Sequence, residues 1–404
     1  MTNTPPVRAR ALILVLALLA AFPPLATDMY LPAFSGIEAH LGAAPGDLEF
    51  SLAVFFLGLG IGQLIIGPSI DRLGRRGPLI AGVVIYCAAS ILIPTVDDVA
   101  AFTALRFVQA IGASAGMVVG RAVLSDLYSG REAARAMTVL VMTMTLGPIV
   151  SPLAGSLLTS VLPWQSVFLA MFAVGLAALA LTLAIVPETL PPSRRVTISP
   201  IGLARRYAGL LARFEFILPL TVASLIQAAM FAFITASSSV LMGVFGLSRI
   251  AFGVAFGIVA LALVVGGQIN HRLLRHTAIH HLLDRGLPLF VLAGALLLAV
   301  SGTSHLAVLI VPVWLAVACV GALSANAMSL AMATTRGAAG TGSAVLGAVQ
   351  FSLAFLCSTL VGAAIDTPVR ALALGVFVPA LLAALLWFAG RLTSAGRASA
   401  FEAR

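Results

Sequence analysis

Long apolar runs alternate with short polar loops along nearly the whole chain. A helix needs roughly 20 mostly apolar residues to cross the hydrocarbon core of a bilayer. Runs of about that length lie near residues 11–33, 50–70, 77–95, 100–121, 134–159, 164–186, 215–237, 249–269, 287–303, 306–329, 341–364 and 369–390. The pattern therefore predicts an all-α integral membrane protein with twelve transmembrane helices.

One long polar stretch, residues 187–213, separates the sixth predicted helix from the seventh. We interpret it as the boundary between two six-helix halves, at 1–190 and 214–404, joined by a cytoplasmic linker at 191–213. A faint internal repeat is consistent with two related halves. Residues of one loop recur 200 positions later, with Gly67, Arg72, Leu73 and Arg75 matched by Gly267, Arg272, Leu273 and Arg275.

Composition narrows the class of protein. Hydrophobic residues make up 61% of the chain and charged residues 9%, whereas about 25% of a soluble domain is charged. The chain has no lysine, which excludes a nucleotide-binding P-loop and Schiff-base chemistry. The sequence also lacks the polar cluster at one interface that a membrane enzyme needs. We therefore expect neither an enzyme nor a bound cofactor.

The arginines predict the orientation of the chain, because cytoplasmic loops of membrane proteins carry an excess of basic residues. With both termini in the cytoplasm, only Arg249 and Arg370 fall outside. The net charge of +9 then reflects topology rather than nucleic-acid binding. We expect a monomer in contact with lipid. Outside the linker, the cytoplasmic arginines are Arg8, Arg10, Arg72, Arg75, Arg76, Arg121, Arg131, Arg135, Arg272, Arg275, Arg285, Arg336, Arg391, Arg397 and Arg404.

The sharpest motif follows the second predicted helix and reads Gly67-Pro-Ser-Ile-Asp71-Arg72-Leu-Gly74-Arg75-Arg76. Its glycines permit a tight turn, and Asp71 can accept hydrogen bonds from arginines or from a helix N-terminus. A basic loop that only sets topology would need the arginines but not this glycine and aspartate spacing. The motif resembles the loop signature of the major facilitator superfamily, which implies a conformational latch.

Ionisable residues inside membrane helices are costly and usually functional. Asp28 lies in the first predicted helix and Arg106 in the fourth. An acid that binds and releases a proton beside a fixed cation suits a proton relay. The alternative is an interfacial cap at Asp28 and a snorkelling anchor at Arg106. Glu49 is a third candidate, although a solvated cap of the second helix explains it equally well.

The fifth predicted helix carries Gly147-Pro148-Ile-Val-Ser151-Pro152-Leu-Ala-Gly155. The prolines bend a helix, and the small residues let a neighbouring helix approach closely. The segment resembles the antiporter motif of the superfamily, usually written Gly-Pro-x-x-Gly-Gly. Ser151 and Pro152 stand where that motif has two glycines.

Nearly the whole chain resembles the Bcr/CflA family of drug:proton antiporters. The local stretches that agree are Asp28-Met-Tyr-Leu-Pro32, Gly62-Gln63, Asp126-Leu-Tyr128, Pro187-Glu188-Thr189-Leu190-Pro191, Ser324-Ala-Asn326-Ala-Met328 and Ala339-Gly340-Thr341-Gly342-Ser343. The resemblance implies a major facilitator fold in a bacterial inner membrane and the export of small amphipathic drugs against protons. It also implies that Asp28 couples the proton and that Arg106 assists. Export of an endogenous metabolite by the same machinery remains an alternative.

The cargo site is less well specified by the sequence. Polar, methionine and aromatic side chains inside the helices suit a cavity that accepts varied ligands. We expect substrate contacts among Tyr30, Gln109, Met142, Gln227, Met230, Phe231, Asn326 and Gln350, although ordinary packing explains any one of them. His276 and His280 have helical metal-ligand spacing but too few neighbouring acids for a strong site, so we expect no metal.

Overall fold

The computed structural model describes residues 6–195, 199–335 and 339–402. Within these ranges, the side chains of residues 6–8, 134, 200, 339 and 393–402 are not described. Of the arginines that predict topology, Arg8, Arg336, Arg397 and Arg404 therefore lie outside the described side chains.

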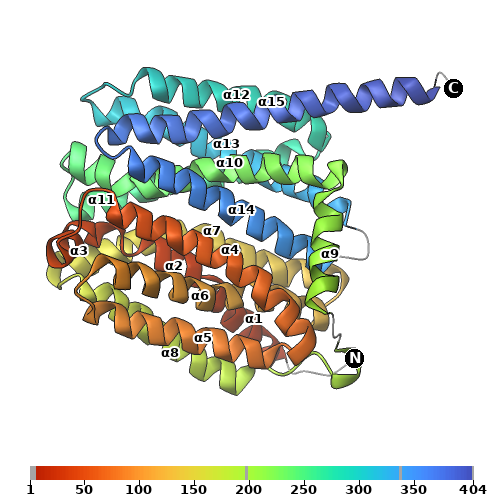
Figure 1. Cartoon of the computed structure of the whole chain (residues 1–404), viewed down its shortest axis with the longest axis horizontal. Helices are drawn as coiled ribbons and strands as arrows, with labels where there is room; N and C mark the ends of the chain where they lie inside the picture. The colour runs from red at the N-terminus through yellow and green to blue at the C-terminus, as the bar shows by residue number, and fades with distance from the viewer. Residues whose placement is uncertain (1–5, 196–198, 336–338, 403–404) are drawn as a thin grey trace. The chain divides into compact units, whose positions relative to one another are not determined.

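The described residues form helices, and twelve of these are long and apolar enough to cross a membrane, as predicted (Figure 1). The longer helices after the first span are α4 (Asp47–Leu73), α5 (Arg76–Leu92), α6 (Val99–Leu127), α7 (Gly130–Val161), α8 (Gln165–Ile185), α10 (Phe214–Ser238), α11 (Arg249–Leu273), α12 (Ile279–Ala299), α13 (Leu306–Ala333), α14 (Ala339–Ala363) and α15 (Pro368–Glu402).

The first span is interrupted where the sequence predicted one helix. It runs over Ala9–Leu41. It contains most of α1 (Pro6–Ala20) and all of α2 (Phe22–Asp28), the 3₁₀ turn η1 (Leu31–Ala33) and α3 (Phe34–Leu41). Proline lacks the backbone N–H that continues a helix, and Pro23, Pro24 and Pro32 lie at these junctions. The break therefore falls directly after Asp28.

The ninth span differs most from its prediction, because α12 begins at Ile279 rather than at residue 287. Its first turns are polar, and the acid in them is paired with another helix. Asp284 accepts a 2.8 Å hydrogen bond from Trp387 Nε1 and pairs with Arg391, both on α15. A search for apolar runs misses such a start, since the polar side chains are satisfied by a distant helix.

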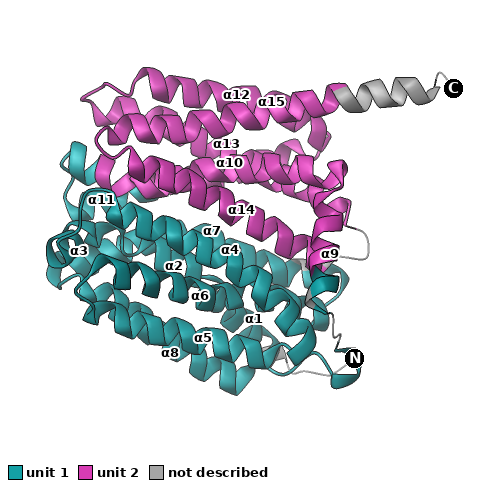
Figure 2. Ribbon diagram, in the orientation of Figure 1, with its two compact units in different colours: residues 1–203, 241–257 teal, residues 204–240, 258–404 magenta. Residues whose placement is uncertain are grey.

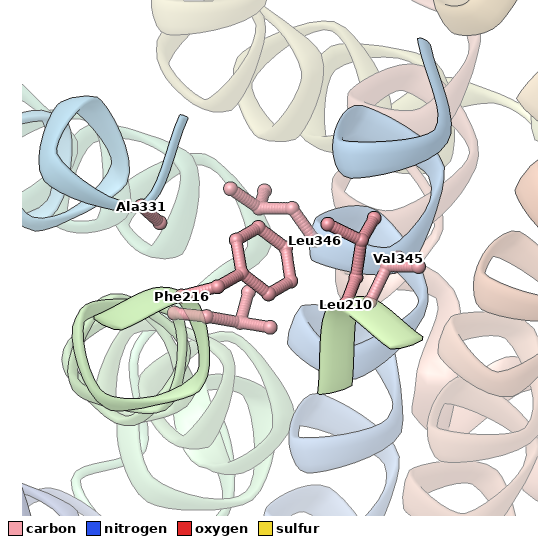
Figure 3. Packing of buried hydrophobic residues seen from close by; sticks show 6 residues of the cluster. Leu210, Phe216, Ala331, Val345 and Leu346 are labelled. Carbon is pink, nitrogen blue, oxygen red and sulfur yellow. The ribbon is translucent and has the colours of Figure 1, made fainter. Parts of the chain in front are cut away.

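The predicted linker also contains a helix, α9 (Pro200–Leu211). Leu210 of α9 packs with Phe216, Leu220, Ala331, Val345 and Leu346 in a buried cluster (Figure 3). Arg205 and Arg206 of the same helix are exposed. The segment is therefore docked through one apolar face rather than extended as a polar tether.

The chain divides into two compact units (Figure 2). Unit 1 comprises Met1–Leu203 and Leu241–Gly257, and unit 2 comprises Ala204–Val240 and Ile258–Arg404. The two loops of the internal repeat follow equivalent helix ends. The helix before the first loop, α4, ends at Leu73, and the helix before the second, α11, ends at Leu273.

Within unit 1, α6 packs closely against both the first span and α5. A Cβ at Gly116 would collide with the carbonyl oxygen of Leu19, and one at Gly112 would lie 2.5 Å from the amide nitrogen of Tyr86. Only glycine permits such close backbone approach. This packing holds the middle of α6 deep inside unit 1, and Arg106 lies two turns before it in the first half of the same helix.

Candidate functional site

Arg106 is fully buried, with an exposed fraction of 0%. Its guanidinium donates to Gln109 Oε1 at 2.5 Å and to the carbonyl oxygen of Ala26 at 2.7 Å. The rings of Tyr30 and Phe55 lie 4.2 and 4.4 Å from its central carbon, which is favourable cation–π geometry. The side chain does not extend toward an interface, so the snorkelling alternative is wrong.

Two residues predicted to contact cargo belong to the surroundings of Arg106. Besides accepting from Arg106, Gln109 donates to Ser90 Oγ at 2.8 Å, and the Tyr30 hydroxyl lies 3.5 Å from Ser51 Oγ. Gln109 and Tyr30 are both fully buried. Gln109 Oε1 and the ring of Tyr30 therefore help to hold the arginine in place.

Asp28 is the last residue of α2 and is also buried, with an exposed fraction of 1%. Thr27 Oγ1 donates to Asp28 Oδ1 at 2.8 Å, whereas Asp28 Oδ2 has no hydrogen-bond partner among the described residues. Arg106 binds the carbonyl of Ala26, two residues earlier, and not the carboxylate. The burial of Asp28 does not fit a solvated interfacial cap. Arg106 contacts the turn that carries Asp28 but forms no ion pair with its carboxylate.

Glu49 lies in the first turn of α4 with an exposed fraction of 1%. This burial excludes the solvated cap that the sequence left open. Its place at the start of α4 is as predicted, and it stays a candidate for proton coupling.

The antiporter motif packs against the segment that carries Asp28. A Cβ at Gly147 would lie 2.6 Å from Pro24 Cγ, and one at Gly155 would overlap the carbonyl oxygen of Met29. Pro148 and Pro152 lie inside α7 without ending it. The two glycines thus let α7 approach the first span on either side of Asp28.

The loop motif between α4 and α5 forms an ion-pair network. Arg75 donates to Asp71 at 2.6 Å and to Asp126, at the end of α6, at 3.0 Å. It also donates to the carbonyl oxygen of Ile70 at 2.9 Å. Arg72 is exposed. Of the motif's arginines, Arg75 therefore ties three helix ends together.

Glu188, after α8, completes this network. Its carboxylate accepts backbone N–H bonds from Arg75 at 2.8 Å, Arg76 at 3.2 Å and Leu190 at 2.9 Å, and so caps α5. Partial burial acts to raise the pKa of Glu188, but these bonds and the charge of Arg195 outweigh it and lower that pKa. Gly74 has φ of +97°, and a Cβ there would collide with the Glu188 carboxylate.

In the sequence, Glu188, Thr189 and Asp126 are only points of resemblance to the family. Thr189 Oγ1 donates to Asp126 Oδ2 at 2.8 Å, so all three act on the loop motif. The sequence offered two signals for these contacts. One is the acid Glu188 directly after a predicted helix, and the other is the loop motif, whose backbone N–H groups need acceptors. Neither signal specifies which distant segments meet.

The predicted cargo residues of unit 2 have different surroundings. Gln227 and Gln350 are half-buried, and Gln227 Oε1 lacks a partner among the described residues. Asn326 instead forms a buried reciprocal amide pair with Asn270, at 2.8 and 3.1 Å. Met230 and Phe231 are buried within unit 2. Asn326 thus has a packing role that the sequence did not reveal.

Two further candidates lie apart from these groups. Met142 on α7 is 56% exposed, as a residue facing cargo or lipid must be. His280 lies in α12 and stacks on Trp387, with ring centroids 6.2 Å apart. In the described part of the chain, His, Cys, Asp and Glu form no group of three or more suited to a metal ion.

The model of the Major Facilitator Superfamily matches residues 16–359. The chain belongs to the major facilitator superfamily. Among curated members, it is 31% identical to the bicyclomycin resistance protein homolog of Haemophilus influenzae, over 86% of this chain and 88% of that protein. It is 32% identical to a chloramphenicol resistance protein of Pseudomonas aeruginosa, over 80% of this chain and 75% of that protein.

Solved structures of major facilitator proteins have the same fold. A D-xylose–proton symporter matches with a TM-score of 0.75 and 14% identity, over 93% of this chain and 97% of that one. The human organic anion transporter MFSD10 matches with a TM-score of 0.66 and 19% identity, over 95% of this chain and 100% of that one. Together with the family, these matches identify a transporter of small molecules rather than an enzyme.

Proposed function

We propose that this major facilitator protein is a proton-coupled antiporter that exports small amphipathic drugs, of the chloramphenicol or bicyclomycin type, by alternating access. The names of its relatives support the class of cargo. The observation that carries the coupling is the buried carboxyl of Asp28, placed at a break in the first span beside the fixed charge of Arg106.

A carboxyl group in a low-dielectric interior is stable when neutral and ionises only when water or a polar partner compensates the charge. Arg106 holds the carbonyl of Ala26 and thus the geometry of the turn that carries Asp28. A change in the packing of that turn as the transporter alternates would change the surroundings of the carboxyl. Asp28 then takes up a proton in one state and releases it in the other, while cargo moves in the opposite direction.

The loop motif has a separate role in this proposal. Its network joins the ends of α4, α6 and α8 to the start of α5. Such an assembly ties these helix ends together and suits the latch that the motif implies. We assign Gly67, Asp71, Arg72, Gly74, Arg75 and Arg76 to this latch.

The cargo class is tested in an efflux-deficient bacterium that expresses the chain. We expect raised inhibitory concentrations for chloramphenicol or bicyclomycin, which disappear when the proton gradient is collapsed. The Asp28→Asn protein, present in the membrane at equal amounts, is the control. Unchanged susceptibility to these drugs, combined with gradient-dependent export of a sugar or amino acid, would favour the metabolite alternative instead.

A further inference from the structure

Ser151 is a buried polar residue on α7, apart from the proposed coupling residues Asp28 and Arg106. Its exposed fraction is 1%, and its hydroxyl has no hydrogen-bond partner among the described residues. Helical hydroxyls usually donate to a carbonyl three or four residues earlier. Thr143, Thr145, Thr159 and Ser160 on the same helix do so. The hydroxyl of Ser151 is therefore available to donate a hydrogen bond to another group.

The helical register directs Ser151 toward the first span. Residues four apart lie on one face of a helix, so Ser151 shares a face with Gly147 and Gly155. These glycines contact Pro24 and Met29, respectively. Ser151 thus lies between two contacts with the first span, opposite the part of the chain between Pro24 and Met29.

The register of α2 places Asp28 on the same side of this interface. Asp28 follows Pro24 by four residues, and both lie within α2, so the two share the face that meets α7. The carbonyl of Ala26 serves Arg106 on α6 instead. This register directs the carboxyl group toward α7. Asp28 Oδ2 and Ser151 Oγ each lack a hydrogen-bond partner among the described residues, so in this structure the two groups are not bonded to each other and both are available.

We propose that Ser151 is a positioning residue for proton coupling, whose hydroxyl donates to the ionised Asp28 carboxylate and so stabilises the deprotonated state. The role of this contact in transport rests on the proposed function. The contact between Ser151 and Asp28 does not, because it can be tested without cargo. A glycine, the residue usual at this place in the antiporter motif, would offer no such donor.

Other groups also act on this carboxyl, and all of them stay in place in the test. Thr27 already donates to the other oxygen of Asp28. The charged or titratable side chains on elements that pack around α2 include Arg106 on α6, Glu49 on α4, Tyr30 before η1, Tyr86 on α5, Arg10 at the start of α1 and, nearest along α7, Arg135. At about 1.5 Å per residue, Arg135 is about 24 Å along the helix from Ser151.

The experiment is an infrared titration of the full-length protein in lipid, without cargo. The absorption of the protonated Asp28 carboxyl is identified as the band that Asp28→Asn removes. Loss of a donor to the ionised form makes ionisation harder, so Ser151→Ala should raise the midpoint of this band by about one pH unit, a tenfold change in the protonation constant. Ser156→Ala is the matched control.

Ser156 suits that control because it is also on α7, equally buried and unpartnered, but faces Gly253 of α11. If Ser151→Ala disturbs insertion, the isosteric pair Ser151→Thr and Ser151→Val separates the hydroxyl from side-chain volume. A wild-type midpoint in Ser151→Ala, equal midpoints in the Thr and Val variants, or the absence of a titrating Asp28 band would each overturn the inference. A shifted midpoint in a protein that exports no drug would instead uphold the contact and reject the proposed function.

Discussion

The carboxylate of Glu188 shows how one residue can organise a loop whose motif lies more than a hundred positions away. It accepts N–H bonds from Arg75 and Arg76 at the start of α5 and leaves room only for a glycine at position 74. Acids stabilise a helix N-terminus through its unpaired N–H groups and its dipole. Gly74 and Glu188 are therefore two parts of one cap.

Replacing this carboxylate gives a prediction with a defined pH dependence. The folded structure lowers the pKa of Glu188, so its contribution to stability is present above the ordinary glutamate pKa and is lost as pH falls through the lower, folded value. We expect Glu188→Gln to reduce the melting temperature at pH 7. Thermal unfolding in detergent measures the difference in melting temperature between Glu188→Gln and the wild-type protein. This difference should shrink on acidification below about pH 4. A deficit that is independent of pH would contradict the cap.

At the residue scale, the sequence indicates which rare charged side chains lie inside helices but not which distant segments contact each other. Asp28 and Arg106 were identifiable because an ionisable group in an apolar helix needs a reason to be there. The aromatic side chains around Arg106, the amide pair of Asn270 with Asn326 and the cap at Glu188 each join segments whose proximity no local pattern encodes.

At the scale of helices, α7 and the first span depend on glycine for their contact. A Cβ at Gly155 would overlap the Met29 carbonyl oxygen next to the break. Small-to-large changes in a packed interior typically cost about 1–3 kcal/mol. We expect Gly155→Ala to lower thermal stability by about this amount and to impair export. The matched control is Gly209→Ala on α9, where a Cβ meets nothing within 4 Å; an equal effect of both changes would contradict the packing.

The helices themselves were largely predictable, because apolar length is a strong local signal. Ends were less so. The early start of α12 depends on the contacts of Asp284 with Trp387 and Arg391 on α15. The position of α9 depends on the packing of Leu210 in a buried cluster of unit 2. The interruption after Asp28 could have been inferred from Pro32, since proline cannot continue a helix.

At the scale of the whole molecule, the arginine distribution predicts an even number of crossings with both termini in the cytoplasm. Reporter fusions placed after Arg404 and within the 187–213 linker should both give a cytoplasmic signal. A fusion in the loop that carries Asp97 and Asp98 serves as the opposite control. A periplasmic signal from either of the first two fusions would contradict the assigned orientation.

The central claim is that Asp28 couples proton movement to export. Asparagine keeps the size and hydrogen bonding of this side chain but cannot titrate, so Asp28→Asn should still bind chloramphenicol. The decisive measurement is drug accumulation in inverted vesicles under an imposed proton gradient, compared for Asp28→Asn and wild-type protein at equal membrane amounts. We expect wild-type vesicles to concentrate the drug and Asp28→Asn vesicles only to equilibrate it. Accumulation by Asp28→Asn equal to wild type would contradict the account and move the coupling role to Glu49.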